Sequence, residues 1–236
     1  MVITIERRNE ILILSIAVDG PAGAGKSTIA KMISDKFNIM YLNTGAMYRA
    51  VTLFAIRDNI NTGDVNGLCS LINSLEMHFD KEKLIVNGED VSELIVHPNI
   101  SNMVSEYSAV KEVRGLLVKM QQDMAQRYNV IMDGRDIGTV VLKNAFIKFY
   151  ITASAEERAR RRFNELKGKG INVDYDTILT DIIKRDYFDS HRDISPLKKA
   201  CDAIEIDTSS LDIQEVVQRI SDYIYEKMKK SNFTVD

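Results

Sequence analysis

A glycine-rich segment near the start of the chain carries the clearest chemical pattern. Residues 20–27 are Gly-Pro-Ala-Gly-Ala-Gly-Lys-Ser, which fits G-x-x-x-x-G-K-[ST]. In this pattern backbone N–H groups wrap around phosphate oxygens, the lysine (Lys26) reaches the β- and γ-phosphates, and the hydroxyl (Ser27) ligates Mg²⁺. The alternative is a turn that merely joins a strand to a helix, and the complete spacing argues against it. The residues predicted to bind a nucleoside triphosphate are Gly20, Pro21, Ala22, Gly23, Ala24, Gly25, Lys26, Ser27 and Thr28.

Two arginines in short polar segments are candidates for holding the group that accepts a phosphate. Arg49 ends the segment Asn43-Thr-Gly-Ala-Met-Tyr-Arg, and Arg135 lies within Asp133-Gly-Arg-Asp. Each segment follows an apolar run, so in a parallel sheet both would lie at the carboxyl edge beside the glycine-rich loop. A guanidinium can hold an acceptor phosphate through two parallel hydrogen bonds. For each arginine alone, a surface ion pair stays open as the alternative.

A charged helical segment carries three further arginines. Arg158, Arg161 and Arg162 share one helix face, because such neighbours are three and four residues apart. Like charges on one face are unfavourable unless anions meet them, as the phosphates of a bound triphosphate would if this helix closed as a lid. A solvated helix whose arginines pair with neighbouring glutamates is the open alternative.

A second charged face follows further along the chain. Arg185, Asp189 and Arg192 are spaced so that they lie on one side of a helix, and their charges are of both signs. This face is suited to a ribose or a phosphate. Pairing among the three side chains themselves is the other interpretation.

Short apolar runs alternate with helical patterns, including helices over about 27–37 and 212–228. Nearly continuous apolar runs between helices indicate an α/β fold with a parallel sheet covered on both faces. The runs predicted as its five strands are 11–18, 39–42, 129–132, 146–151 and 203–206.

The stretch 63–114 breaks this rhythm. Segments 75–79 and 83–86 alternate apolar and polar residues, and Asn87-Gly88 is a strong hairpin pattern, so we predict an inserted antiparallel module. The predicted division is an N-terminal extension without a clear role (1–10), a core (11–62 and 115–236) with a helical lid at about 155–170, and the inserted module (63–114).

Composition bounds the class of protein. The 236 residues include 31 Lys and Arg against 34 Asp and Glu, a net charge of -3, and 45% are hydrophobic. A globular domain with a sizeable core is expected, and an overall basic nucleic-acid binder is disfavoured. The apolar run near the start is too short to cross a bilayer, and two cysteines are too few for a disulfide framework. We expect a cytoplasmic monomer with no membrane or nucleic-acid partner.

Several strings resemble those of the bacterial cytidylate kinase family. They are VDGPAGAGKST at 18–28, TGAMYR at 44–49 and DGRDIGTVV at 133–141, with Arg185, Asp189 and Arg192. The third string is specific to that family, whereas a glycine-rich loop alone is not. The resemblance covers nearly the whole chain and implies a P-loop NTPase core with an inserted nucleoside monophosphate (NMP)-binding module. It implies transfer of the γ-phosphoryl group of ATP, with Mg²⁺, to CMP or dCMP, giving the diphosphate and ADP.

The resemblance also implies roles for individual residues. The residues that would contact the cytosine are Ser105, Arg114 and Asp136. The residues that would surround the phosphate and sugar of the acceptor are Thr44, Tyr48, Arg49, Asp133, Arg135, Arg185, Asp189 and Arg192. The residues that would act on the transferred group are Lys26, Arg49, Arg135 and Arg162, and Arg158 and Arg161 would bind ATP. A carboxylate at 136 would accept from the amino group of cytosine and repel the carbonyl of uracil.

One position departs from the family pattern, and two other functions stay open. Asn43 stands where an aspartate is expected, which removes a negative charge that bears on the choice between ribose and deoxyribose. The first alternative function is another small-molecule kinase acting on UMP, AMP or shikimate. The second is a nucleotide-binding switch. The 133–141 string favours cytosine, and the arginine-rich cleft disfavours a switch.

Overall fold

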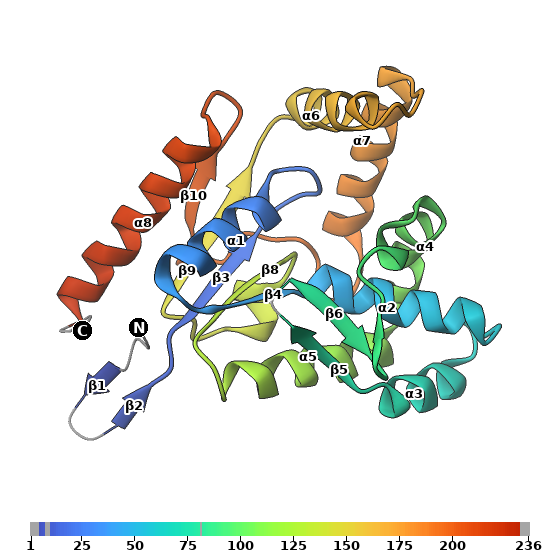
Figure 1. The fold of residues 1–236 in the computed structure, drawn as a ribbon, viewed down its shortest axis with the longest axis horizontal. Coiled ribbons are helices and arrows are strands. Elements are labelled where there is room, and N and C mark those ends of the chain that lie inside the picture. The colour runs from blue at the N-terminus through green and yellow to red at the C-terminus, as the bar shows by residue number, and fades with distance from the viewer. Residues whose placement is uncertain (1–4, 8–9, 81, 232–236) are drawn as a thin grey trace.

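A five-stranded sheet forms the centre of the protein. The computed structural model describes residues 5–7, 10–80 and 82–231. Within them the strands of this sheet lie in the order β10-β9-β3-β8-β4, and every pairing is parallel (Figure 1). Their bounds are β3 (Ser15–Asp19), β4 (Met40–Asn43), β8 (Val130–Gly134), β9 (Ile147–Thr152) and β10 (Ile204–Asp207). The predicted α/β fold with a parallel sheet is confirmed.

The first predicted strand, 11–18, is wrong as a single element. Its first part belongs to β2 (Glu10–Leu12), which pairs antiparallel with β1 (Ile5–Arg7), and β3 starts only at Ser15. Between them the backbone N–H of Leu14 donates to the side chain of Asn129 at 2.7 Å, outside any ladder. An apolar run does not reveal such a change of partner. The rest of the predicted extension, 1–4 and 8–9, lies outside the described residues.

Helices cover both faces of the sheet. Their bounds are α1 (Lys26–Phe37), α2 (Thr44–Arg57), α3 (Val65–Ser74), α4 (Pro98–Ala109), α5 (Lys111–Ala125), α6 (Ala155–Gly168), α7 (Tyr175–His191) and α8 (Ile213–Lys230). On one face, Ile33 of α1 and Ile220 of α8 pack in the same cluster as Phe149 of β9. On the other face, α5 and the π-helical turn Ile137–Val141 pack on β4 and β8. Burial on both sides explains why the strands are continuous apolar runs.

The inserted stretch contains a small antiparallel sheet of β5 (Met77–Asp80), β6 (Lys83–Val86) and β7 (Glu89–Asp90). Asn87 and Gly88, with φ of 50° and 82°, form the turn between β6 and β7, so the hairpin predicted there is confirmed. This sheet shares a hydrophobic cluster with α2, α3, α4 and the first half of α5. Helix α2, which lies in the predicted core range 11–62, packs with the inserted stretch in this cluster. The boundaries of the three predicted parts therefore stay a prediction.

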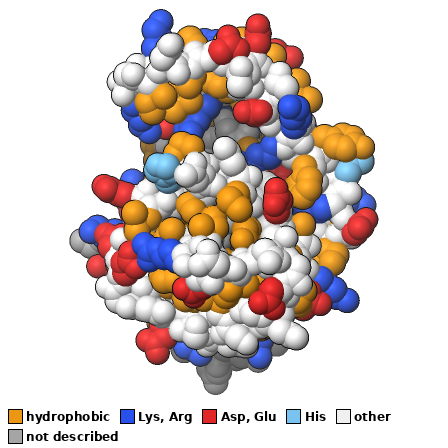
Figure 2. Space-filling model, turned by 90° about the vertical axis from the view of Figure 1, so that its right-hand side faces the viewer, with side chains coloured by type: hydrophobic (Ala, Val, Ile, Leu, Met, Phe, Trp, Pro, Cys, Tyr) orange, Lys and Arg blue, Asp and Glu red, His pale blue; other side chains and the backbone are white. Residues whose placement is uncertain are grey.

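Two charged helices stand above the carboxyl edge of the sheet (Figure 1). α6 and α7 pack against each other, and the rings of Phe163 and Tyr175 lie edge to face with centroids 6.2 Å apart. A hollow bordered by Lys and Arg side chains separates them from the lower part of the molecule in the space-filling view (Figure 2). In the ranges that the structure describes, no helix has both the length and the hydrophobicity needed to cross a membrane.

The core of the sheet gives a first prediction. Phe149 is fully buried on β9, so Phe149→Ala leaves a cavity and lowers the free energy of unfolding by about 3–5 kcal/mol in urea titrations. Tyr128→Ala is the control, because that side chain is 50% exposed, and its effect should stay within about 0.5 kcal/mol. A Phe149→Ala loss no larger than that of the control contradicts the packing described here.

Candidate functional site

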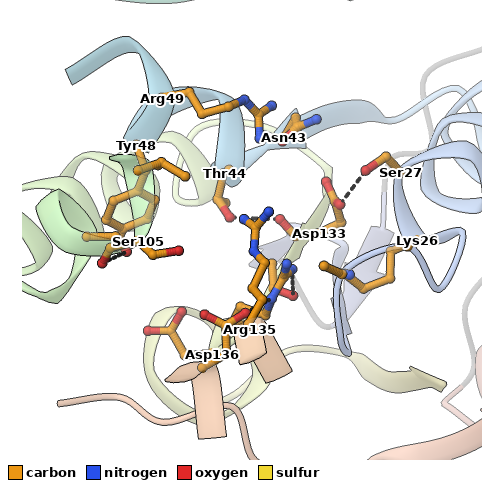
Figure 3. A pocket seen from close by; sticks show the side chains of 18 of the residues that line it. Lys26, Ser27, Asn43, Thr44, Tyr48, Arg49, Ser105, Asp133, Arg135 and Asp136 are labelled. Carbon is orange, nitrogen blue, oxygen red and sulfur yellow. Dashed lines mark hydrogen bonds and ion pairs between the residues drawn. The ribbon is translucent and has the colours of Figure 1, made fainter. Parts of the chain in front are cut away.

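A pocket of about 380 Å³ lies where β3, β4 and β8 end. Ligands bind at this carboxyl edge in open parallel sheets, because the loops that follow neighbouring strands meet there. Side chains from the glycine-rich loop, from the start of α2 and from the turn after β8 converge on it (Figure 3). The predicted site residues that line it are Ala22, Gly23, Lys26, Ser27, Thr44, Tyr48, Arg49, Ser105, Arg114, Asp133, Arg135, Asp136, Arg162, Arg185, Asp189 and Arg192.

Some predicted residues lie outside this lining, and some lining residues were not predicted. The former are Gly20, Pro21, Ala24, Gly25, Thr28, Arg158 and Arg161. The residues that sequence reasoning missed are Gly45, Val104, Ser108 and Gly134. Val104 and Ser108 belong to α4, one residue before and three after Ser105. Helical periodicity around Ser105 would have found Ser108, and Val104 lies one turn before Ser108 on the same helix.

The glycine-rich loop is tightly constrained by its neighbours. A Cβ at Gly20 would lie 1.9 Å from the backbone oxygen of Ile151, so only glycine fits there. Gly25 has a φ of 85° and precedes the first turn of α1, which no side chain among the described residues caps. The N–H groups of that turn therefore need an acceptor, and the positive end of the helix dipole favours an anion.

Lys26 is buried at the floor of the pocket, where its Nζ donates to the carbonyl oxygen of Pro21 at 2.7 Å. Burial lowers the pKa of Lys26 well below its usual range, and the nearby Arg135 cation lowers it further. A bound anion beside the ammonium group would raise this pKa again and so favour the charged form. This lysine is therefore suited to phosphate.

Asp133 is held between two hydroxyl groups. Ser27 Oγ donates to its Oδ2 at 2.8 Å, and Tyr41 Oη donates to its Oδ1 at 2.8 Å. Burial and the Asp133 carboxylate raise the pKa of Tyr41 above its ordinary value, so its phenol stays a donor. A serine hydroxyl beside a carboxylate is a pair of hard oxygen ligands of the kind that Mg²⁺ prefers. Sequence reasoning missed Tyr41, which lies inside an apolar run.

On the opposite side of the pocket, buried arginines and carboxylates form a network. Arg114 Nη2 donates to Asp136 Oδ2 at 2.5 Å, and Arg135 Nε donates to Asp189 Oδ2 at 2.8 Å. Arg192 Nη2 lies 4.0 Å from Asp136 Oδ1, and Arg192 Nη1 lies 3.9 Å from Asp189 Oδ1. Burial alone raises the pKa of Asp189, but the charge and the hydrogen bond of Arg135 bring it below its ordinary value.

Positive charge exceeds negative charge in the pocket. Seven lining residues are Lys or Arg and three are Asp. Burial lowers the pKa of Arg49, Arg185 and Arg192. The buried Nε atoms of Arg49 and Arg185 have no hydrogen-bond partner among the described residues, so a simple surface ion pair does not account for them. The pocket therefore favours a ligand that carries several negative charges.

Comparison with known proteins agrees with this chemistry. The family model described as "Cytidylate kinase" matches residues 16–226. The protein named cytidylate kinase from Clostridium acetobutylicum is 62% identical over 215 residues, which is 91% of this chain and 99% of that protein. The chain belongs to the cytidylate kinase family. The protein of the same name from Clostridium perfringens is 58% identical over 90% of this chain and 98% of its own length.

A solved structure shows the same fold at low sequence identity. The crystal structure of an uncharacterized protein from Eubacterium ventriosum matches with a TM-score of 0.51 and 15% identity. The match covers 91% of this chain and 99% of that chain. At this identity the likeness concerns the fold alone.

In this member of the cytidylate kinase family, the three arginines of the predicted lid do not form a free cationic face. Arg161 pairs with Glu157 and donates to Thr208, and Arg162 pairs with Glu165. These contacts agree with the glutamate-pairing alternative. Of the three arginines predicted to share a face, Arg162 lines the pocket, whereas Arg158 is buried against the neighbouring helix α7. Phosphate binding by Arg158 and Arg161 stays a prediction.

Asn43, the departure from the family pattern, caps the helix that carries Arg49. Its Oδ1 accepts from the backbone N–H of Ala46 at 3.0 Å, and the residue also lines the pocket. An aspartate would make the same N-terminal cap, so asparagine at this position removes a negative charge but keeps the cap of α2.

Asp19 is a residue that sequence reasoning missed. It is 3% exposed, and its two carboxylate oxygens accept from the backbone N–H groups of Ile137 and Gly138, both at 2.7 Å. These bonds fix the turn that directly follows Arg135 and Asp136. Burial raises the pKa of Asp19 to about 6, although both hydrogen bonds oppose the shift. An aspartate that ends a buried strand was the available signal.

The raised pKa of Asp19 predicts a specific dependence of stability on pH. The native carboxyl, with a pKa of about 6, binds its proton more tightly than the unfolded one at 3.8, so its contribution to stability falls as pH rises from about 4 to 6. Asp19→Asn removes this titration. The unfolding free energy of the wild type minus that of Asp19→Asn should therefore decrease by up to about 3 kcal/mol between pH 4 and 7 in urea titrations. A difference that stays constant or increases with pH rules out the raised pKa.

Proposed function

We propose that this protein transfers the γ-phosphoryl group of ATP to CMP or dCMP, giving CDP or dCDP and ADP. The observation that carries the proposal is a single pocket that joins the glycine-rich loop to the buried Arg114–Asp136 pair. The first element is suited to a triphosphate and the second to a base with an amino group. Relatives named cytidylate kinase with 62% and 58% identity support the same acceptor.

On the donor side, Lys26 and the first turn of α1 would hold the phosphates of ATP. The Ser27 hydroxyl and the Asp133 carboxylate fit Mg²⁺, since this ion is commonly held by one or two carboxylates together with substrate phosphates. When bound, Mg²⁺ would neutralise charge on the β- and γ-phosphates. Tyr41 would orient Asp133 for that task. Asp133, predicted from the sequence as a substrate-binding residue, would therefore also help to hold the metal.

On the acceptor side, Asp136 would accept a hydrogen bond from the amino group of cytosine. Its Oδ2 is held by Arg114, and Arg114 Nη1 also donates to the backbone oxygen of Ser108 at 3.0 Å. The carboxylate is therefore fixed before substrate arrives. Uracil would place a carbonyl oxygen against this carboxylate, and the repulsion would reject it. Ser105 lies one turn before Ser108 on α4, and it would complete the contact with the base.

The reaction requires alignment and charge stabilisation. The acceptor phosphate oxygen is already a nucleophile, so a strong general base is not needed. Arg135, oriented by Asp189, would hold the acceptor phosphate together with Arg49 and Arg192. Arg162 would add positive charge as α6 closes, and closure would exclude water as a competing acceptor.

The remaining assignments are parts of the same proposal. Arg185 and Asp189 would contact the sugar, and Thr44 and Tyr48 would line the space around the acceptor phosphate. Thr44 Oγ1 donates to the backbone oxygen of Asp133 at 2.7 Å, which ties the start of α2 to the end of β8. Arg161 stays a candidate for binding ATP, and so does Arg158, whose guanidinium is held by Ala153, Ala22 and Asp186. The monomeric state and the cytoplasmic location stay predictions.

The proposal is tested by ADP formation from Mg-ATP with CMP, dCMP, UMP, AMP, shikimate or no acceptor. Fast turnover confined to CMP and dCMP is expected, because the Asp136 carboxylate disfavours the carbonyl of uracil and the relatives named cytidylate kinase favour cytosine over adenine. The ratio between the two shows the effect of Asn43. Preference for another acceptor overturns the assignment of the base-binding residues, and ATP binding without acceptor-dependent turnover favours a nucleotide switch.

Asp136→Asn tests recognition of the base. The amide keeps an acceptor oxygen but loses the negative charge that would strengthen the hydrogen bond to cytosine and that pairs with Arg114. The KM for CMP should therefore rise by about 10–100-fold, while the KM for ATP changes less than about threefold. Steady-state kinetics with each substrate varied in turn measure both values. Asp193→Asn, an exposed site after α7, is the control and should leave both unchanged. Equal increases for CMP and ATP would show that Asp136 does not contact the base.

A further inference from the structure

Arg158 was predicted to bind the phosphates of ATP, but the structure surrounds it with protein acceptors. The residue is 4% exposed. Its Nε donates to the backbone oxygen of Ala153 at 2.9 Å, and its Nη1 donates to the backbone oxygen of Ala22 at 3.0 Å. A Cβ placed on Gly23 would lie 3.4 Å from the Cβ of Arg158, so the helix packs directly on the glycine-rich loop.

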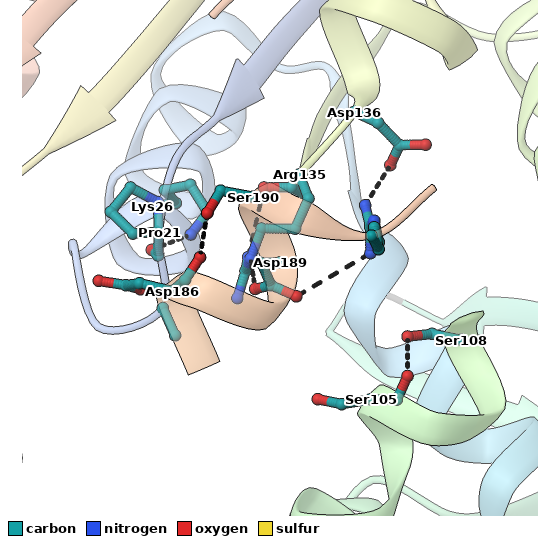
Figure 4. A network of polar contacts seen from close by, with 12 residues as sticks. Pro21, Lys26, Ser105, Ser108, Arg135, Asp136, Asp186, Asp189 and Ser190 are labelled. Carbon is teal, nitrogen blue, oxygen red and sulfur yellow. Dashed lines mark hydrogen bonds and ion pairs between the residues drawn. The ribbon is translucent and has the colours of Figure 1, made fainter. Parts of the chain in front are cut away.

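The charge of Arg158 is met by a carboxylate on the next helix. Asp186 Oδ1 accepts from Nη1 at 3.0 Å, and Oδ2 accepts from Nη2 at 2.5 Å. This two-pronged contact fixes the plane of the guanidinium as well as its position. The backbone of Asp186 is tied in turn, since Ser190 Oγ donates to its carbonyl oxygen at 2.6 Å (Figure 4).

The segment of α7 around Asp186 carries two pocket residues. Arg185 is its neighbour in sequence, and Asp189 lies one turn further along, where it accepts from Arg135 (Figure 4). A shift of Asp186 would therefore move the residues proposed to contact the acceptor. A continuous path of hydrogen bonds and helix backbone runs from Ala22 in the glycine-rich loop, through Arg158 and α7, to Arg135.

We infer that Arg158 and Asp186 form a positioning pair that couples the glycine-rich loop and α6 to the acceptor-facing side of α7. All three guanidinium nitrogens of Arg158 have protein acceptors, and the side chain does not line the pocket. Binding phosphate would require breaking a buried ion pair and leaving Asp186 uncompensated. Arg49 and Arg185 differ, because each keeps a buried Nε without a partner among the described residues.

A double-mutant cycle on the full-length chain tests this pair, and its kinetic arm rests on the proposed function. Asp186→Asn and Arg158→Lys each keep size but lose the two-pronged contact. Each should raise the KM for CMP about tenfold, and the double variant should be no worse than the more severe single variant. Arg160→Lys is the control, since Arg160 is exposed on the same helix and pairs with Glu157, and it should leave both KM values unchanged.

Phosphate binding by Arg158 predicts a different result for Asp186→Asn. If Arg158 is a phosphate ligand, Asp186→Asn frees it from a competitor and lowers the KM for ATP, with no change for CMP. That result, a silent Asp186→Asn, or additive losses in the double variant would overturn the pairing role. Melting temperatures of all variants separate these effects from loss of fold, and non-additive losses of melting temperature are expected for a coupled pair.

Failure of the proposed function is distinguishable from failure of this inference. If the wild type uses a different acceptor, the same cycle is measured with the KM for that acceptor. If it uses none, calorimetric binding of CMP and ATP to the four proteins replaces the kinetics. In either case the coupling between Arg158 and Asp186 is expected to remain, and independent effects of the two substitutions contradict it.

Discussion

The concentration of buried positive charge at one edge of a parallel sheet is the constraint on which the site depends. Seven cationic side chains face one pocket with three carboxylates, and burial lowers the pKa of Lys26 and of several arginines. Such an arrangement costs free energy unless carboxylates or bound anions compensate it. The protein supplies only part of the compensation, through ion pairs with Asp136, Asp189 and Glu165 and through the nearby charge of Asp133. The remainder of the charge is available to phosphates on both sides of the transfer.

The three carboxylates of the pocket differ in the groups that donate hydrogen bonds to them, and this difference separates their roles. Asp136 and Asp189 each accept from an arginine, so they fix Arg114 and Arg135 while lowering the cost of burying them. Asp133 accepts from two neutral hydroxyls, so its negative charge is not cancelled by a direct ion pair. That difference is what makes Asp133 suited to a cation and the other two suited to orienting arginines.

Sequence pattern predicted the sheet and most of the pocket for a clear physical reason. Parallel strands buried on both faces are apolar runs, and the segments that follow them must meet at one edge, which placed Arg49 and Arg135 beside Lys26. Helix periodicity grouped Arg158 with Arg161 and Arg162, but it could not show that Arg158 forms an ion pair with Asp186 on another helix. Tyr41 and Asp19 were missed because their roles depend on partners about a hundred residues away in sequence.

Asp19 shows why the donor and acceptor sides are not independent. It ends β3, and the next residue, Gly20, begins the glycine-rich loop, whose position is fixed by close contact with Ile151. Its carboxylate simultaneously holds the N–H groups of Ile137 and Gly138, directly after Asp136. One strand end therefore sets the spacing between the glycine-rich loop and Asp136, the carboxylate proposed to contact the base. In-line transfer requires the bound donor and acceptor to be held at a fixed spacing, and a buried acceptor of two backbone hydrogen bonds helps to set it without entering the pocket.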